Sequence, residues 1–304
     1  GDYPWHDINR TKECTIDRTV SLYGDLNFWW VMNDKGNIHT ETGAEPIGME
    51  IRAQAFAFAS NDEVNNMTFY NYELINRGTQ TLFDTYFGFF TDGALGDPYD
   101  DYVGCDVNRG LAYYYNGDNY DGDNSGYLGY GTSPPAVGVD FFEGPYQDND
   151  GIDNAFGINE NEALNGIGFG DGVIDNERFG MRRFLYYSNT TNGANPSQTD
   201  PVAAGDYYNY LKGYWKDGSK FIYGGSGHIS DAAADPNTPC DFMFPGDTDP
   251  LGWGTNGVPQ APWTEQTSNN PPNDRRFVQS AGPFVLKPGA VNNITVGIAW
   301  ARAS

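Results

Sequence analysis

The sequence predicts an all-β protein: an antiparallel β-sandwich with a long acidic loop insertion and at most one or two short helices. Three observations predict this fold class. Apolar and polar residues alternate over segments near both ends of the chain, aromatic residues make up 15% of the sequence, and Gly, Asp and Asn dominate residues 91–178. A period of two is typical of strands with one buried face, and clustered Gly, Asp and Asn are typical of turns.

The first 90 residues carry the clearest strand patterns. The segment 20–32 (VSLYGDLNFWWVM) runs into the turn NDKGN, which predicts a hairpin. From Ile47 to Ala55 every second residue is apolar, as in a strand with one face buried. The aromatic segments 67–76 and 82–90 follow, separated by the turn-prone RGT. We expect these segments to form a meander of antiparallel strands.

The last part of the chain predicts further strands and one helix. MRRFLYYS (181–188) and KFIYGG (220–225) are typical of strands, and FVLKPG leads through a turn into a final strand, NNITVGIAWA (292–301). We expect this last strand to complete the sandwich. The predicted helix lies in DYYNYLKGYW, where residues at helical spacing are Tyr207, Leu211, Tyr214 and Trp215. In the final strand, the residues that share one face are Ile294, Val296, Ile298 and Trp300.

These patterns divide the chain into three parts of one composite domain. Residues 1–90 and 181–304 supply the two parts of the sandwich, and residues 91–180 form an acidic, loop-rich insertion with only short apolar runs such as AVGVDFF. A loop-rich stretch of this length is unusual in a compact domain unless something other than a hydrophobic core holds it, and bound ions are the usual substitute.

The charge of the chain excludes some classes of partner. The net charge is -24, and 19 acidic residues but one basic residue, Arg109, lie between Asp84 and Glu177. This balance argues against nucleic acid and against an anionic membrane surface, because both attract Lys and Arg. No run of 18 apolar residues is present, so no membrane insertion is expected. The chain begins at Gly1 without a signal peptide, and we expect it to be a piece of a longer or processed protein.

The acidic insertion is a candidate calcium site, since Ca²⁺ takes six to eight oxygen ligands from flexible Asp- and Asn-rich loops. Four stretches qualify: 92–101, 116–124, 148–154 and 170–177. None fits the EF-hand loop. The alternative is that these residues simply form turns. The missing basic partners favour at least one bound cation, because buried unpaired carboxylates are costly. The expected ligands are Asp148, Asp150, Asp153, Asp171 and Asp175.

Catalytic motifs are weak. The chain has three histidines and three cysteines, with no CxxC, so one disulfide is possible but a zinc or thiol redox site is not indicated. GGSGH (224–228) lacks the second glycine of a nucleophile elbow. A glycan-processing hydrolase would need two facing carboxylates, and the chain has too many acids to nominate a pair. Trp and Tyr rings could stack on sugars, although packing in the core of the sandwich explains them better.

Several phrases together carry a resemblance. The segments IGMEIRAQAFAFASNDEVNNMTFYNYELINRGTQTL, DTYFGFFTDGALGDPYDDYVGCDVNRGLAYYYNGD, GDGVIDNERFGMRRF and QSAGPFVLKPGAVNNITVGIAWA are similar to large secreted proteins of Bacteroidota that carry a C-terminal sorting domain for type IX secretion. The resemblance covers most of the chain. It implies an exported protein, extracellular or on the outer cell surface, in which this region is a non-catalytic β-rich portion. The sorting domain itself is absent from these 304 residues.

The residues and the resemblance lead to one expected function and two alternatives. We expect a structural or adhesive surface module that calcium stabilises. The expected partners are other surface proteins or glycans, in a larger outer-membrane or extracellular assembly. A pure glycan-binding module is the first alternative. The second is a glycan-processing hydrolase that uses paired carboxylates.

Overall fold

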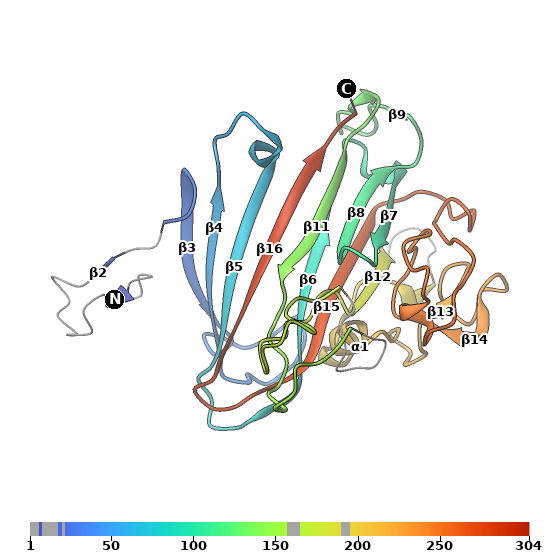
Figure 1. Cartoon of the computed structure of the whole chain (residues 1–304). Coiled ribbons are helices and arrows are strands. Elements are labelled where there is room, and N and C mark those ends of the chain that lie inside the picture. The colour runs from blue at the N-terminus through green and yellow to red at the C-terminus, as the bar shows by residue number, and fades with distance from the viewer. Residues whose placement is uncertain (1–5, 8–17, 20–21, 157–164, 190–194, 304) are drawn as a thin grey trace.

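The computed structural model of the chain describes residues 6–7, 18–19, 22–156, 165–189 and 195–303 (Figure 1). Two antiparallel sheets of unequal size dominate it. The larger has seven strands in the order β3-β4-β5-β16-β11-β8-β7. Their bounds are β3 (Leu26–Asn33), β4 (Met49–Ala57), β5 (Met67–Asn76), β16 (Val291–Ala301), β11 (Ala136–Glu143), β8 (Leu111–Asn116) and β7 (Asp101–Asp106).

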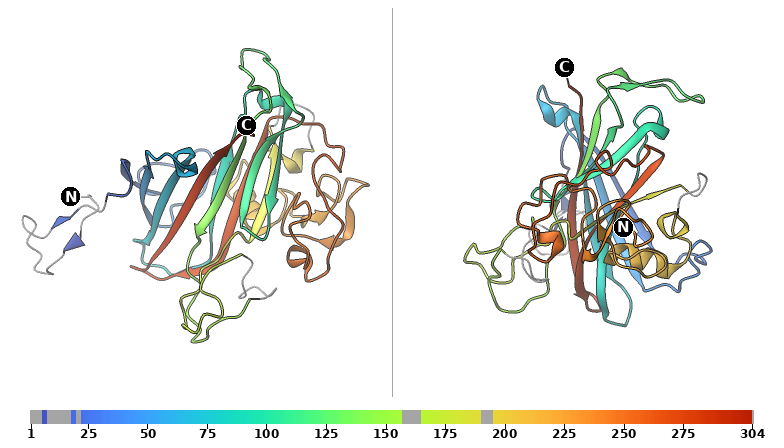
Figure 2. Two further views of the ribbon diagram at one scale, coloured as in Figure 1. Left: turned by 45° about the horizontal axis from the view of Figure 1, so that its top comes forward. Right: turned by 90° about the vertical axis from the view of Figure 1, so that its right-hand side faces the viewer.

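The smaller sheet has three strands in the order β12-β15-β6. They are β12 (Arg183–Ser188), β15 (Arg275–Leu286) and β6 (Leu82–Asp92). This sheet packs on one face of the larger sheet, and the views in Figure 2 show the two layers. Buried residues from both sheets form one hydrophobic cluster, which includes Val139, Val296 and Phe277. The predicted all-β, sandwich-like fold class is therefore confirmed.

The remaining regular elements are short. The described residues contain one α-helix, α1 (Ala204–Lys212). The 3-10 helices are η1 (Glu63–Asn66), η2 (Pro98–Asp100), η3 (Pro196–Gln198) and η4 (Trp253–Thr255). The small strands are β1 (His6–Asp7), β2 (Arg18–Thr19), β9 (Tyr120–Asp121), β10 (Gly131–Thr132), β13 (Ile222–Tyr223) and β14 (Asp235–Pro239).

Alternating residues place the predicted strands correctly. β5 coincides with the predicted segment 67–76, and in β16 the side chains of Ile294 and Val296 are buried as expected. In β4, Ala53 lies in the core, but Ile47 precedes the strand and is exposed. A strand pattern thus identified the buried face, because successive side chains point to opposite faces of a sheet.

The predicted meander is wrong at its last step. β4 pairs with both β3 and β5, as a meander requires, but β5 then pairs with β16 from the far end of the chain. β6 instead leaves the large sheet and pairs with β15 in the small one. Both β5 and β6 are rich in aromatic residues, which favour strands without specifying a neighbouring strand.

Residues 91–180 also differ from the expected loop insertion. β7, β8 and β11 come from this range and form one side of the large sheet. All six residues of β7 are buried, so its sequence shows no alternation. In β8, Tyr113, Tyr114 and Tyr115 occupy both faces and hide the period of two. Among the described residues of this range, the loop-rich part is therefore confined to the segments before and between these strands and to residues 144–156 and 165–182.

Loops from residues 213–274 cover the free edge of β7. Three backbone N–H groups on this edge find partners there: Val103 donates to Glu265 Oε1 (3.0 Å), Cys105 to the Phe244 carbonyl (3.2 Å) and Val107 to Thr248 Oγ1 (3.0 Å). Covering an edge in this way prevents further strand pairing. Cys105 and Cys240 are buried and free, and Cys14 lies outside the described residues.

The predicted helix is present but shorter than its pattern suggested. It ends at Lys212, because Gly213 adopts a left-handed conformation with φ of 81° and caps it. Tyr214 and Trp215 therefore lie beyond the helix, and Tyr210 is its buried side chain. No helix in the described part of the chain is long and apolar enough to cross a membrane.

Candidate metal centre

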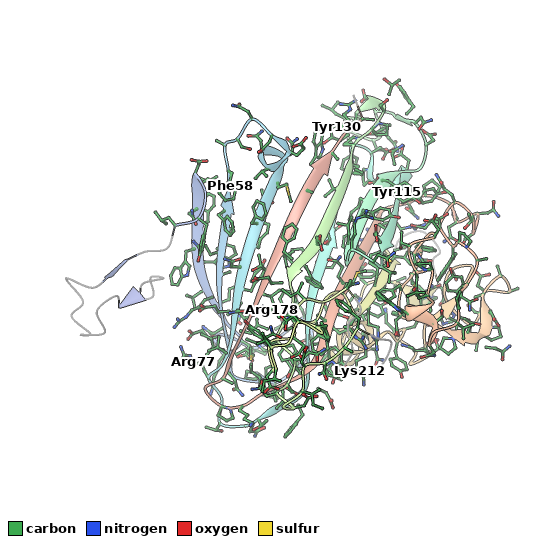
Figure 3. All side chains as sticks on the ribbon, viewed as in Figure 1. Phe58, Arg77, Tyr115, Tyr130, Arg178 and Lys212 are labelled. Atoms are coloured by element: carbon green, nitrogen blue, oxygen red, sulfur yellow. The ribbon has the colours of Figure 1, made fainter. Side chains whose placement is uncertain are left out.

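The five predicted calcium ligands lie in one double loop at the lower end of the large sheet. We define the double loop as residues 148–156 and 165–178. Figure 3 labels Arg178, where the loop returns to the sheet. There the Arg178 guanidinium donates to the carbonyls of Gly144 and Asn293 (both 2.9 Å) and lies 3.7 Å from the centroid of the Tyr146 ring. The two halves of the loop are thus anchored side by side.

Each half of the double loop uses an aspartate to bind the other half. Asp153 accepts backbone N–H bonds from Gly170 (2.8 Å) and Gly172 (2.7 Å). In return, Asp175 Oδ1 accepts N–H bonds from Asp150 (2.8 Å) and Gly151 (2.9 Å). This exchange brings Asp153 and Asp175, which are half-buried, into equivalent positions.

The other three predicted ligands are exposed, and two of them, Asp150 and Asp171, accept bonds within their own turns. Asp150 Oδ1 and Asp171 Oδ1 each accept the N–H two residues ahead, from Ile152 (2.9 Å) and Val173 (2.8 Å). Asp148 Oδ1 accepts the N–H of Val285 in β15, at 2.8 Å. Bonds of an aspartate to its own turn were the alternative interpretation in the sequence, and the structure contains them.

No Lys or Arg neutralises these carboxylates within the described residues. None of the five aspartates forms an ion pair with a basic side chain there. The Asn176 amide and the Val173 N–H hold the pKa of Asp171 below its ordinary value. The negative charge is therefore stabilised by hydrogen bonds to uncharged groups, which leaves oxygen atoms available to a cation.

The carboxylates do not form a complete ligand set as they stand. Across the part of the chain that the structure describes, no three His, Cys, Asp or Glu side chains are arranged to hold a metal ion. An ion in the double loop would need the exposed aspartates to turn toward Asp153 and Asp175. Ca²⁺ accepts irregular oxygen ligands, with backbone carbonyls and water among them.

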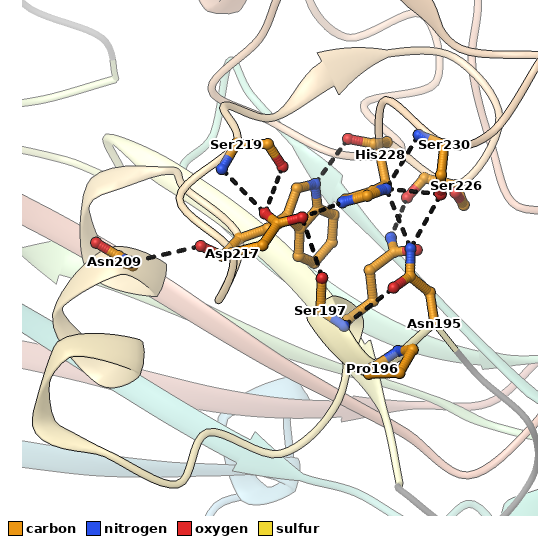
Figure 4. A network of polar contacts seen from close by, with 12 residues as sticks. Asn195, Pro196, Ser197, Asn209, Asp217, Ser219, Ser226, His228 and Ser230 are labelled. Atoms are coloured by element: carbon orange, nitrogen blue, oxygen red, sulfur yellow. Dashed lines mark hydrogen bonds and ion pairs between the residues drawn. The ribbon is translucent and has the colours of Figure 1, made fainter.

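A second polar site centres on His228, which the sequence analysis did not assign to any function. Figure 4 shows its contacts. His228 Nε2 lies 2.9 Å from Asp217 Oδ2, and Nδ1 lies 2.7 Å from Ser230 Oγ. Burial opposes ionisation of Asp217, but bonds from Ser219, His228 and Ser197 hold its pKa well below the ordinary range.

The residue types of the His228 network match a Ser-His-Asp triad, but the bonding indicates a structural role. His228 Nδ1 accepts the Ser230 backbone N–H (3.1 Å) and lies 3.0 Å from Asn195 Nδ2. These donors occupy the nitrogen that would act as the base toward Ser230, and Nε2–H then donates to Asp217. The His228 side chain is also only 5% exposed. The network ties together the loops around residues 195, 217 and 228.

An aromatic groove of about 210 Å³ lies on the small sheet beside α1. Phe90 and Tyr207 on its walls are 53% and 40% exposed, and the rings of Phe90 and Tyr187 stack with centroids 6.3 Å apart. The neighbouring Arg276 pairs with Asp92 (3.1 Å). No sequence motif indicated this groove, because its residues come from four separate segments, in β6, β12, β15 and residues 201–211. A row of aromatic residues in β6 was the nearest signal.

Comparison with protein-family models finds no match to this chain, and comparison with curated protein sequences finds none either.

Proposed function

We propose that this protein is a non-catalytic structural or adhesive module, extracellular or on the outer cell surface, in which calcium stabilises the double loop. The reciprocal bonding of Asp153 and Asp175, with no basic partner among the described residues, carries the proposal. A cation that binds between the two halves would bind the folded chain and not the unfolded one, because the halves are separate in the unfolded chain. Such binding stabilises the fold.

The chemical setting supports the proposed extracellular location, and the proposed export by type IX secretion rests on the sequence resemblance. Calcium sites of 10⁻⁴–10⁻³ M affinity are typical of extracellular modules. The net charge of -24 keeps the chain away from nucleic acid and anionic lipid. The proposed partners are surface proteins or glycans in a larger outer-membrane or extracellular assembly.

One edge of the large sheet supports an adhesive role. β3 is the outermost strand of that sheet, and it carries no charged residue. Leu26, Phe28 and Met32 are 54%, 60% and 42% exposed on it. An apolar strand at the edge of a sheet is a surface to which a strand of another protein can add.

Calcium removal tests the proposed function. We expect millimolar calcium to raise the Tm of the chelated chain by several degrees, since an ion at about 10 times its Kd contributes about 1.4 kcal/mol. The double variant Asp153→Asn, Asp175→Asn should lose part of that rise. Thermal unfolding with calcium and with a chelator measures this rise in Tm. The rise is compared between variants, rather than the Tm itself, because the substitutions also weaken hydrogen bonds.

Magnesium is the control ion, and Glu45→Gln is the matched charge control, since Glu45 is exposed and far along the chain from the double loop. A calcium response equal in the double variant and in Glu45→Gln would reject the double loop as the site. No response in any variant would reject calcium altogether.

Glycan binding is the second candidate function, and the aromatic groove favours it. Exposed aromatic rings stack on the C–H faces of sugars, while charged groups such as Arg276 and Asp92 bond hydroxyls. The exposed rings of Phe90 and Tyr207 are available for this, and the buried Tyr187 supports Phe90 by stacking on it.

We expect Tyr207→Ala to weaken binding of a glycan identified on an array by at least about tenfold, the effect of losing ~1.4 kcal/mol of stacking. Titration calorimetry with that glycan measures it. Tyr208→Ala is the matched control, because Tyr208 is 39% exposed but lies outside the groove. Equal losses in the two variants, or no glycan bound by the unsubstituted chain, would rule out the groove as a glycan site.

A further inference from the structure

The upper end of the large sheet, opposite the double loop, holds a second group of acids. We define the buried carboxylate cluster as Asp97, Asp100, Asp101 and Asp121 together with Asn116. Asp101 is 0%, Asp121 1%, Asn116 6% and Asp97 7% exposed, and Asp100 is half-buried. In Figure 3 the label of Tyr130, whose N–H donates to Asp121 Oδ2 (2.7 Å), marks this end, and Arg178 marks the other.

Strand pairing sets the position of two members of the cluster. Asp101 begins β7 and lies directly opposite Asn116, the last residue of β8. Paired residues of an antiparallel ladder project to the same face. Val103 and Tyr114, two positions further along each strand, are both buried in the hydrophobic core. Asp101 and Asn116 therefore point inward, at the end of the sandwich.

Asp101 and Asp121 both accept hydrogen bonds from the turn at residues 95–97. Asp101 Oδ2 accepts the N–H of Leu95 (3.0 Å), and Asp121 Oδ1 accepts the N–H of Asp97 (3.1 Å). Gly96 lies between these two donors with φ of 72°, and a Cβ there would lie 1.9 Å from Asp121 Oδ2. The turn passes so close to the carboxylate that only glycine fits.

Three oxygens of the cluster have no hydrogen-bond donor. Asp100 Oδ1, Asp101 Oδ1 and Asn116 Oδ1 are buried and unpartnered. No ion pair with Lys or Arg reaches Asp97, Asp100, Asp101 or Asp121 within the described residues. A buried acceptor without a partner costs about 1–3 kcal/mol, and more when it is charged. Few native groups are left this way without a ligand or another reason.

The charges in the cluster also oppose one another. Burial raises the pKa of Asp101 to about 8, and the Asp100, Asp121 and Asp97 carboxylates add to the rise against a bond from Leu95. Burial, Asp97, Asp121 and Asp118 raise the pKa of Asp100 to about 6. Either protons or a cation must offset this negative charge at neutral pH.

We propose that the buried carboxylate cluster binds one Ca²⁺ ion, independently of the double loop. Oxygen atoms from carboxylates and an amide suit a hard cation, and the absence of His and Cys from the cluster disfavours zinc. Ca²⁺ accepts irregular sets of ligands, whereas Mg²⁺ needs near-octahedral geometry. The cluster is not a closed ligand set, but Asp100 Oδ1, Asp101 Oδ1 and Asn116 Oδ1 are themselves free of hydrogen bonds and can act as ligands of an ion.

The substitution Asp101→Asn distinguishes two ways of neutralising the cluster, a bound cation or protons shared among the carboxylates. Asparagine has the shape of a protonated aspartic acid. If protons neutralise the cluster, the variant keeps every calcium ion and its calcium-free Tm at pH 7.5 rises or stays the same. If Ca²⁺ neutralises it, the variant binds one ion fewer per chain and shows a smaller calcium-dependent rise in Tm.

Titration calorimetry of the chelator-treated chain with CaCl₂ at pH 7.5 is the test. We expect Asp101→Asn to lose one site, and the double variant Asp153→Asn, Asp175→Asn to keep that site. Asp140→Asn is the matched control. Asp140 is a half-buried carboxylate, and burial and the nearby Asp106 raise its pKa to about 6. It lies at the other end of β11 from the cluster.

The outcomes distinguish this proposal from the proposed function. A full set of ions in Asp101→Asn overturns the cluster site whatever the double variant does. Loss of one ion in Asp101→Asn but none in the double variant supports the cluster and rejects the double loop. If Asp101→Asn does not fold, Asp100→Asn replaces it, since Asp100 is half-buried and its Oδ1 has no bond to lose. Unchanged stoichiometry there overturns the proposal equally.

Discussion

Replacing Glu265 with alanine is expected to destabilise the protein by about 3–5 kcal/mol, the cost of leaving a buried charge without its partner. Glu265 is 0% exposed and accepts two bonds from Arg275 through Oε2, at 3.0 and 2.8 Å. Its Oε1 also accepts the Val103 N–H on the edge of β7. The substitution therefore leaves the buried Arg275 without its charged partner. It also removes a hydrogen-bond acceptor that covers the edge strand β7. Urea denaturation at 25 °C measures the loss.

Two comparisons separate the causes. Asp92→Asn removes one carboxylate partner of the neighbouring Arg276. The Asp92 side chain in this ion pair is 45% exposed, so the substitution should cost less than about 1 kcal/mol of stability. The double variant Glu265→Leu, Arg275→Met removes both charges and should recover part of the loss. A Glu265→Ala cost no larger than that of Asp92→Asn would show that the buried pair does not hold the loops on β7.

Replacing Trp215 with alanine is expected to cost about 3–5 kcal/mol, as for other fully buried aromatic residues. Trp215 is 0% exposed and contacts the rings of Tyr186, Tyr210 and Phe221, with centroids 6.3, 6.2 and 4.8 Å away. Its Nε1–H donates to the Gly227 carbonyl at 2.8 Å. Residues 195–270 have little regular structure, so this side chain supplies much of their core. Urea denaturation again gives the free energy of unfolding.

Trp300→Ala is the control for size and chemistry, because Trp300 lies on β16 and is 38% exposed. It should cost much less than Trp215→Ala. Trp215→Phe should fall between the two, since it keeps most of the packing but removes one of the two donors to the Gly227 carbonyl, which also accepts the Ile222 N–H at 3.1 Å. Equal costs for the two tryptophans would mean that the loop region does not depend on Trp215.

The candidate site could be predicted from the sequence only in part. Asp, Asn and Gly in 148–154 and 170–177 indicated an acidic turn-forming region, and the structure brings these two stretches together. The exchange of bonds between Asp153 and Asp175 could not be foreseen, because it depends on how two loops meet. Equally, nothing local distinguished Asp101, which is buried in a strand, from an exposed aspartate such as Asp171.

The sequence by itself determined the strands β4, β5 and β16 and the buried faces of β4 and β16, because the period of two is a property of neighbouring residues. It also determined the charge and therefore the classes of partner to exclude. Only the tertiary structure decided that β5 lies beside β16, that β6 joins the second sheet, and that Glu265 meets Arg275. These choices follow from burying distant apolar surfaces and pairing distant backbone groups, and no local pattern encodes which distant partner gives the lowest free energy.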